Sequence, residues 1–304
     1  MFCGMSCLPM VNATPNRHVD VVIGLGPNGM SDQFSVEVPN GEIVKAVDGI
    51  SFKIKQGETL GLIGESGCGK SVTALSIIRL IPKYSGKLNG EIYFNNRNLL
   101  ELSENEMQSV RGKEIGMIFQ EPMTSLNPIM NIGEQISESL IKHLRMSKNS
   151  SIDRVLELLQ MVGIADGKRR IKDYPHQFSG GQRQRIMIAM ALSCEPSLLI
   201  ADEPTTSLDV TIQAQILELI KELSRNLGLS VLLITHNLGI VARYADNIAV
   251  MNKGKIVEYG SCEDVYKNPR HKYTIGLLNS VPRITGPIFK ELATIQKEDI
   301  NEKD

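Results

Sequence analysis

The stretch GESGCGKS, at residues 64–71, has the residue types and spacing of a phosphate-binding loop. Its glycines allow successive backbone N–H groups to converge on phosphate oxygens, and a following helix places its positive dipole end at the same point. Lys70 is expected to contact the β- and γ-phosphates of a nucleotide, and the Ser71 hydroxyl is expected to bind Mg²⁺. The residues predicted to surround the phosphates are Gly64, Glu65, Ser66, Gly67, Cys68, Gly69, Lys70, Ser71 and Val72.

Two adjacent acidic residues follow a second apolar run, LLIA at residues 198–201. Asp202 is placed to hold Mg²⁺ through water, and Glu203 is placed to act as the base that polarises an attacking water. Adjacent acids after a strand also occur as simple helix caps. Because a phosphate-binding loop needs a carboxylate on the metal side, its presence favours the catalytic interpretation.

A second anion-binding pattern is FSGGQ, at residues 178–182, immediately before a helical run. Ser179, Gly180 and Gly181 at a helix N-terminus present backbone N–H groups to an anion, and Gln182 follows them. The same residues could also form only an N-cap and a tight turn. If both loops bind phosphate, they need either two phosphate groups or two chains.

A competing glycine loop lies near the N-terminus in VVIGLGPNG, residues 21–29. Its three glycines match the G-x-G-x-x-G pattern of dinucleotide-binding proteins, which requires a helix after the last glycine. Residues 34–38 instead alternate between apolar and polar side chains, as in a strand, and Pro39 stops the run. We therefore interpret the loop as a turn. An oxidoreductase with bound flavin or nicotinamide is the competing hypothesis, and an absorption spectrum would test it.

The elements that must position these residues alternate between strands and helices. Expected buried strands end at the predicted phosphate loop, at Gln120 and just before Asp202, and each is an apolar run. Strands that alternate with helices favour a mostly parallel sheet. The pattern predicts strands at 59–63, 114–120, 198–201 and 231–235, helices at 72–81, 181–194 and 210–227, and a helical region at about 129–178, in which residues 150–153 cap a helix.

The amino-acid composition further limits the possible classes of protein. The chain has 304 residues with 33 basic and 34 acidic side chains, so an extended basic surface for nucleic acid has little support. No apolar run approaches the ~20 residues that a membrane-spanning helix needs, and we recognise no secretory signal. The five cysteines form no C-x-x-C pair, which indicates a reducing compartment and no cysteine metal site. We expect a cytoplasmic protein.

From about residue 43 to 265 the chain resembles the ATP-binding subunits of ABC transporters, because six motifs occur in the family's order. GESGCGKS is similar to the Walker A loop, FSGGQ to the signature motif and LLIADE to the Walker B strand. Residues 207–209 resemble the D-loop, Gln120 the Q-loop glutamine and His236 the switch histidine. The resemblance implies an α/β fold, with a P-loop NTPase (RecA-like) core on a mostly parallel sheet, an antiparallel β subdomain and an inserted helical subdomain.

The resemblance also implies ATP and Mg²⁺ as ligands, and a mechanism. Two ATPase subunits pack head to tail, so that each ATP lies between the phosphate loop of one chain and residues 179–182 of the other. Gln120 would bind Mg²⁺ and sense the γ-phosphate, His236 would contact the γ-phosphate, and Glu203 would activate the water. Closure and reopening of the dimer would drive a permease that docks on the helical subdomain.

Longer sequence stretches narrow the resemblance to one subfamily. FQEPMTSLNP, FSGGQRQRIMIAMAL and NPRHKYTIGLLNSVPR are similar to peptide and nickel importers, and the first two look more like the first of two paralogous ATPases. The implied partners are a second ATPase in a heterodimer, two membrane permease subunits and, indirectly, an extracytoplasmic substrate-binding protein. The implied location is peripheral, on the cytoplasmic face of the cell membrane. A soluble ABC-type ATPase acting on nucleic acid or ribosomes is the alternative, although such chains generally carry tandem ATPase domains or coiled-coil insertions, which are not recognised here.

Three features depart from the family pattern. Gln182 stands where first-type subunits often carry methionine. No cysteine follows Cys262, so we expect no iron–sulfur cluster, and an iron assay tests this. The N-terminus departs most: Phe34 is the candidate for the aromatic residue that stacks on adenine, but the spacing around residues 39–42 is irregular. We divide the chain into an N-terminal segment (1–40), an ATPase domain (41–265) and a C-terminal extension (266–304).

Overall fold

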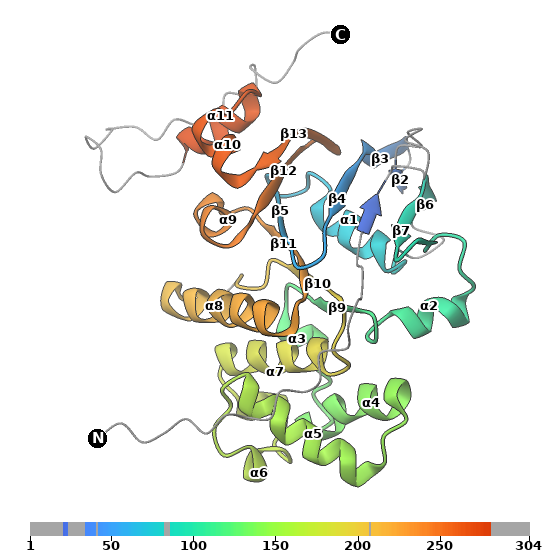
Figure 1. Ribbon diagram of the computed structural model, residues 1–304, viewed down its shortest axis with the longest axis vertical. Coiled ribbons are helices and arrows are strands. Elements are labelled where there is room, and N and C mark those ends of the chain that lie inside the picture. Colours follow the sequence, from blue (N-terminus) through green and yellow to red (C-terminus); the bar gives the residue numbers. More distant parts are fainter. Residues whose placement is uncertain (1–20, 24–33, 41, 82–85, 207, 281–304) are drawn as a thin grey trace.

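The computed structural model describes residues 21–23, 34–40, 42–81, 86–206 and 208–280, and it describes only the backbone at residues 21, 34–40 and 42–44. A six-stranded sheet lies at the centre of the molecule (Figure 1). Its order is β13-β12-β5-β11-β10-β9, and neighbours are parallel except β13 and β12. The predicted α/β fold with a mostly parallel sheet is confirmed. The strands are β5 (Thr59–Ile63), β9 (Ile115–Ile118), β10 (Leu198–Asp202), β11 (Ser230–Thr235), β12 (Asn247–Asn252) and β13 (Lys255–Ser261).

Helices cover the sheet and build a second lobe. The helix expected at 72–81 begins earlier, at Lys70, because Gly69 takes the left-handed conformation (φ 110°) directly before the first turn. The helix expected at 210–227 is found in full. The helices are α1 (Lys70–Ile77), α2 (Glu104–Val110), α3 (Pro122–Ser125), α4 (Ile132–Leu144), α5 (Lys148–Met161), α6 (Gly167–Arg170), the 3₁₀ helix η1 (Pro175–Gln177), α7 (Gly180–Leu192), α8 (Val210–Leu227), α9 (Leu238–Tyr244), α10 (Cys262–Lys267) and α11 (Lys272–Asn279).

The central strands are apolar on both faces because helices or strands cover both sides, as parallel sheets require. In β10, Ile200 packs into a cluster with α1 and the antiparallel strands, whereas its neighbour Ala201 packs into a second cluster with α7 and α8. Alternate side chains of one strand therefore serve two separate cores. This double burial holds the strand ends rigidly at one edge of the sheet.

Two small antiparallel sheets form the β subdomain beside the core. The first has the order β4-β1-β7-β8, and the second has the order β3-β2-β6. In the first, Ile23 is fully buried, and its strand is antiparallel to both neighbours, unlike the parallel strand of a dinucleotide-binding unit. Residues 24–29 of the competing glycine loop lie outside the described residues. The strands are β1 (Val21–Ile23), β2 (Phe34–Asn40), β3 (Glu42–Ile50), β4 (Phe52–Ile54), β6 (Lys87–Asn89), β7 (Ile92–Phe94) and β8 (Arg97–Asn98).

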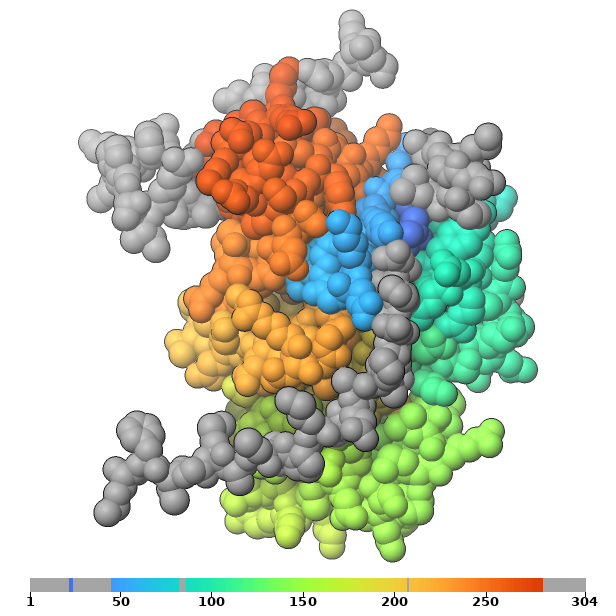
Figure 2. All heavy atoms as spheres, viewed as in Figure 1, coloured from blue at the N-terminus to red at the C-terminus, as the bar shows by residue number. Residues whose placement is uncertain are grey.

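Helices α4, α5 and α6 form a lobe at the lower end of the molecule (Figures 1 and 2). The cap predicted at residues 150–153 is wrong by one turn, because Ser147 is the N-cap of α5 and its hydroxyl accepts the Ser150 N–H at 3.2 Å. The first turn of α5 is mostly polar, so the apolar periodicity that guided the prediction becomes visible only at Val155. In the described part of the chain, no helix combines the length and apolar content that crossing a membrane requires.

Candidate functional site

Most of the predicted site residues line one cavity of about 840 Å³ at an edge of the central sheet. Parallel strands end at the same edge, so residues that follow β5, β9, β10 and β11 meet there although they are far apart in sequence. The cavity volume falls within the ~300–1,000 Å³ that is usual for small-molecule sites. Its lining residues are Ala46, Gly64, Glu65, Ser66, Gly67, Gly69, Lys70, Ser71, Val72, Gln120, Glu203, His236, Leu277 and Ser280.

The ammonium group of Lys70 is buried and faces the carbonyls of its own loop. Its Nζ donates to the carbonyl oxygens of Gly64 at 2.8 Å and Glu65 at 2.7 Å. A bound phosphate would supply the negative charge that these neutral acceptors lack, through stronger, charge-assisted hydrogen bonds. Cys68 was predicted among the phosphate-binding residues, but its thiol lies behind the loop, 3.8 Å from Lys70 Nζ, and does not line the cavity. Burial raises the pKa of that thiol.

Two glycines of the loop are required by close packing. A Cβ at Gly64 would overlap the backbone carbonyl of Met251, and one at Gly69 would lie 2.5 Å from the carbonyl oxygen of Ala46. Gly69 also has a positive φ, which only glycine adopts without strain. The loop is therefore clamped between β3 and β12, and its shape is set before any ligand binds.

Ser71 lines the cavity on its predicted metal side, and the buried Asp202, which does not line the cavity, contacts Ser71. The Ser71 hydroxyl donates to Asp202 Oδ1 at 3.1 Å, although the two residues come from different elements. Asp202 is 5% exposed, and burial raises the pKa of its carboxyl against the opposing effect of the Ser71 hydrogen bond. A hydroxyl and a carboxylate are oxygen ligands of the kind that Mg²⁺ takes together with substrate phosphates. The residues present therefore fit the predicted metal.

Replacing Asp202 with asparagine is expected to stabilise the ligand-free protein at neutral pH, by about 2–4 °C in melting temperature for each kcal/mol gained. Because folding raises the pKa of this carboxyl, its charged form is disfavoured in the folded state, and the cost appears as pH rises from the unfolded pKa through the folded pKa. The advantage of Asp202→Asn should therefore vanish below about pH 4.

The melting temperatures of the wild type and of Asp202→Asn are measured between neutral pH and about pH 4, with and without ATP and Mg²⁺. The variant should lose most of the stabilisation that the nucleotide and metal give to the wild type. A lower melting temperature for the variant at neutral pH would contradict the assigned cost of burying Asp202.

Three side chains surround the carboxylate of Glu203. Gln120 Nε2 donates to Oε2 at 3.2 Å, the Thr206 hydroxyl donates to the same oxygen at 2.9 Å, and His236 Nδ1 lies 3.3 Å from Oε1. The side chain of Glu203 is 14% exposed, whereas that of His236 is 61% exposed. The carboxylate is thus held in one orientation while the imidazole faces the open side of the cavity.

The backbone of Glu203 is also unusual. Its φ is +45°, in the left-handed region that non-glycine residues rarely enter. Its N–H donates to the carbonyl of Ile234 at 2.9 Å, which ties the residue to the adjacent strand β11. A strained residue that its surroundings hold in place is typical of active sites. This geometry turns the carboxylate of Glu203 into the cavity, directly after the buried Asp202.

The FSGGQ motif forms the start of α7, away from this cavity. The Ser179 hydroxyl accepts the Gln182 N–H at 3.3 Å, and Gln182 Oε1 accepts the Ser179 N–H at 3.1 Å, which is a capping box. A Cβ at Gly181 would lie 2.7 Å from the Ile212 side chain, so this glycine also lets α7 approach α8. None of the residues 179–182 lines the cavity. Within one chain, the structure does not bring the two predicted anion cradles together.

Two other predictions, the D-loop and the adenine-stacking residue, fall partly outside the described structure. Ser207 of the predicted D-loop lies outside it, whereas Asp209 caps α8 by accepting the Ile212 N–H at 3.0 Å. Phe34 is the first residue of β2, where its backbone pairs with Ile50, but its side chain lies outside the described part. The adenine-stacking assignment therefore stays a prediction.

Sequence reasoning missed several residues at the site. Thr206 could have been found, because it lies three positions after Glu203 in the run ADEPTT. Ala46, Leu277 and Ser280 carry no chemical signal, and only the folded chain brings them to the cavity. The hydroxyl of Tyr273 accepts the N–H of Glu65 at 3.0 Å, a contact across 208 positions that no local pattern reveals.

A phosphate-binding loop, a serine–aspartate pair and an oriented glutamate at one edge of a parallel sheet define an ATPase of the P-loop class. Comparison with known proteins narrows this class to one family. Residues 47–206 match the family model described as ABC transporter, and residues 257–304 match the one described as oligopeptide/dipeptide transporter, C-terminal region. The chain belongs to the ABC transporter ATPase family.

Similar proteins include ATP-binding proteins of dipeptide and oligopeptide transport. The dipeptide transport ATP-binding protein DppD of Bacillus subtilis is 57% identical over 245 residues, covering 80% of this chain and 73% of that protein. The oligopeptide transport ATP-binding protein OppD of Salmonella typhimurium is 50% identical over 246 residues, covering 81% and 73%. Among solved structures, a dimeric post-hydrolysis state of the ATP-binding cassette MJ0796 bound to ADP and Pi is similar, with a TM-score of 0.68, 28% identity and coverage of 80% of this chain and 98% of that chain.

Proposed function

We propose that this chain is the ATP-hydrolysing subunit of a peptide importer. The observation that carries the proposal is the joining of an ABC ATPase site with a C-terminal region of the oligopeptide/dipeptide transporter type in one chain. The curated relatives are described as dipeptide and oligopeptide transport ATP-binding proteins, which supports a peptide as the cargo.

The chemistry proposed for the site is in-line attack of water on the γ-phosphate of ATP, in which the bond from the γ-phosphorus to the β–γ bridging oxygen breaks and ADP leaves. Glu203 accepts a proton from the water, and its contacts with Gln120 and Thr206 keep the carboxylate aimed. His236 faces the open side, where it contacts the γ-phosphate. Lys70 leaves its two loop carbonyls and binds the β- and γ-phosphates. Mg²⁺ held by Ser71, Asp202 and Gln120 would neutralise phosphate charge.

The proposed assembly is a head-to-tail pair of ATPase subunits with a second, paralogous chain as the partner. The separation of residues 179–182 from the cavity supports this assembly. An anion-binding loop that does not line the cavity of its own chain can bind the nucleotide held by a second chain. Ser179, Gly180 and Gly181 of each subunit would then bind the γ-phosphate held by the other. Two membrane permease subunits would dock on the helical lobe at the cytoplasmic face of the cell membrane, and an extracytoplasmic binding protein would deliver the cargo.

Isolating the complex with its binding protein, and identifying the bound cargo by mass spectrometry, tests the proposed function. Recovery of a permease and of short peptides is expected. Nickel in place of peptides would move the chain to the other branch that the sequence resembles. Stimulation of ATP hydrolysis by nucleic acid, without any permease, would instead favour the soluble alternative.

Replacing Phe34 with alanine is expected to weaken ATP binding by about fivefold or more, because one stacked base contributes ~1–3 kcal/mol. Phe34 begins β2, which pairs with β3, and β3 contributes Ala46 to the cavity. Titration with a fluorescent ATP analogue measures the change. Tyr174→Ala removes an exposed aromatic residue just before η1, outside the cavity, and is the control. Unchanged affinity in Phe34→Ala would remove Phe34 from the site.

A further inference from the structure

The last described helix is fastened to the central sheet at its N-terminal end. Glu258 of β13 accepts the backbone N–H of Arg270 at 2.8 Å and that of His271 at 3.1 Å. His271 in turn caps α11, because its Nδ1 accepts the N–H of Tyr273 at 3.2 Å. Helix α11 therefore begins at a fixed point beside the sheet.

Tyr273 connects α11 to the phosphate-binding loop. Its ring is 4% exposed and packs in a cluster with Ile63, the last residue of the strand that leads into the loop. Its hydroxyl oxygen accepts the N–H of Glu65 at 3.0 Å. Burial raises the pKa of Tyr273 to about 12, so the hydroxyl keeps its proton at neutral pH and the contact does not titrate there.

The peptide unit between Gly64 and Glu65 is held on both sides. Its N–H donates to Tyr273, and its carbonyl, which belongs to Gly64, accepts the ammonium of Lys70 at 2.8 Å. In a trans peptide these two groups point in opposite directions, so the two contacts together fix the orientation of the plane. When Lys70 turns to a phosphate, the contact to Tyr273 is the one that remains.

The far end of the same helix forms part of the cavity wall. Leu277 and Ser280 line the cavity together with the loop and His236. One helix thus contacts the loop through its first turn and faces the nucleotide space through its last. The phosphate-binding loop is supported from outside the ATPase core, by the C-terminal region.

We propose that Tyr273 is a positioning residue for ATP, and that α11 sets the affinity of the site by holding the Gly64–Glu65 peptide in the nucleotide-binding orientation. The proposal rests on the ATP binding assigned above. With the hydroxyl in place, the loop is ordered before the nucleotide arrives, so binding does not have to supply that order.

The test is Tyr273→Phe, which removes one oxygen and keeps the packed ring. The expected result is ATP binding weaker by about threefold to tenfold, the range that one net hydrogen bond gives. The KM for ATP should rise by the same factor, while kcat at saturating ATP stays within about twofold of the wild type, because Tyr273 touches none of the reacting atoms. Binding is measured with the full chain and a fluorescent ATP analogue, and turnover is measured in the assembled complex.

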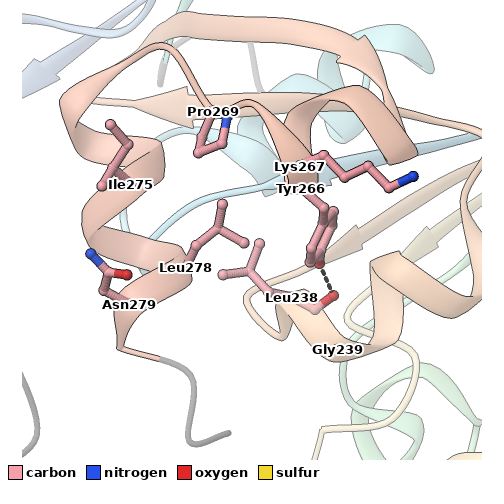
Figure 3. A pocket seen from close by; sticks show the side chains of 8 residues that line it. All are labelled: Leu238, Gly239, Tyr266, Lys267, Pro269, Ile275, Leu278 and Asn279. Carbon is pink, nitrogen blue, oxygen red and sulfur yellow. Dashed lines mark hydrogen bonds between the residues drawn. The ribbon is translucent and has the colours of Figure 1, made fainter.

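Tyr266→Phe is the matched control. Tyr266 packs against the same cluster, and its hydroxyl donates to the carbonyl of Leu238 in α9, at the hollow drawn in Figure 3, which is separate from the nucleotide cavity. The Tyr266→Phe variant should bind ATP with the affinity of the wild type. Wild-type affinity in Tyr273→Phe, or an equal loss in both variants, would overturn the positioning role. Failure of the unmodified chain to bind ATP would overturn the proposed function as well, so the two failures are distinguishable.

Discussion

Replacing Glu203 with glutamine is expected to lower the rate of ATP hydrolysis by about 10²–10⁴-fold, the contribution of one general base, and to leave ATP binding intact. Glutamine has nearly the same shape, so contacts with Gln120 and Thr206 are retained in part. The amide, however, cannot accept a proton from water at neutral pH. The variant should therefore keep ATP bound rather than turn it over.

Phosphate release from the assembled complex, together with a binding titration, measures both parts of this result. Glu218→Gln is the control, because Glu218 is an exposed carboxylate that contacts Arg243 and Tyr244 at 3.3 Å, away from the cavity. Normal turnover in Glu203→Gln would show that another group activates the water.

Replacing Lys70 with alanine is expected to weaken ATP binding by about 10²-fold or more, since charged hydrogen bonds contribute ~1.5–3 kcal/mol each. The ammonium is buried and already aligned in the loop, so the change removes a positive charge placed for the β- and γ-phosphates. The carbonyls of Gly64 and Glu65 also lose their shared donor. Hydrolysis should fall with binding.

A titration with the fluorescent analogue measures the loss, and thermal melts check that the variant folds. Lys221→Ala, which removes a half-buried lysine that contacts the carbonyl of Arg243 at 3.3 Å, away from the cavity, serves as the matched control. ATP binding of wild-type strength in Lys70→Ala would contradict the assignment of residues 64–71 as the phosphate-binding loop.

The sequence predicted the central sheet well because its strands are short, continuous apolar runs between clear turn signals. The run at residues 198–201 is one such strand, and residues 210–227 form a helix with the predicted bounds. The cap of α5 was misplaced because the mostly polar first turn, from Lys148, shows no apolar periodicity. Strand β1 was missed because three apolar residues before a glycine loop also fit a turn.

Only those site residues that belong to local sequence motifs could be predicted. The loop carrying Lys70 and the pair Asp202 and Glu203 have recognisable neighbours in sequence. The fold brings Lys70 and Glu203 to one cavity and places Asp202 in contact with Ser71 in its wall. The contact between Tyr273 and Glu65 joins two stretches of ordinary composition, so no periodicity or spacing signals it. Its position depends on the packing of α11 against the end of β5, which only the folded chain provides.

Uptake of a labelled peptide by proteoliposomes that contain the assembled complex, with either wild-type chain or Glu203→Gln, tests the proposed function most directly. ATP hydrolysis is followed in the same vesicles. The wild type should show peptide uptake that requires ATP, and the variant should lose uptake and hydrolysis together. Peptide uptake at the wild-type rate with Glu203→Gln would contradict the assignment of this chain as the ATPase subunit of a peptide importer. Hydrolysis of ATP by the wild type without any peptide uptake would contradict it as well.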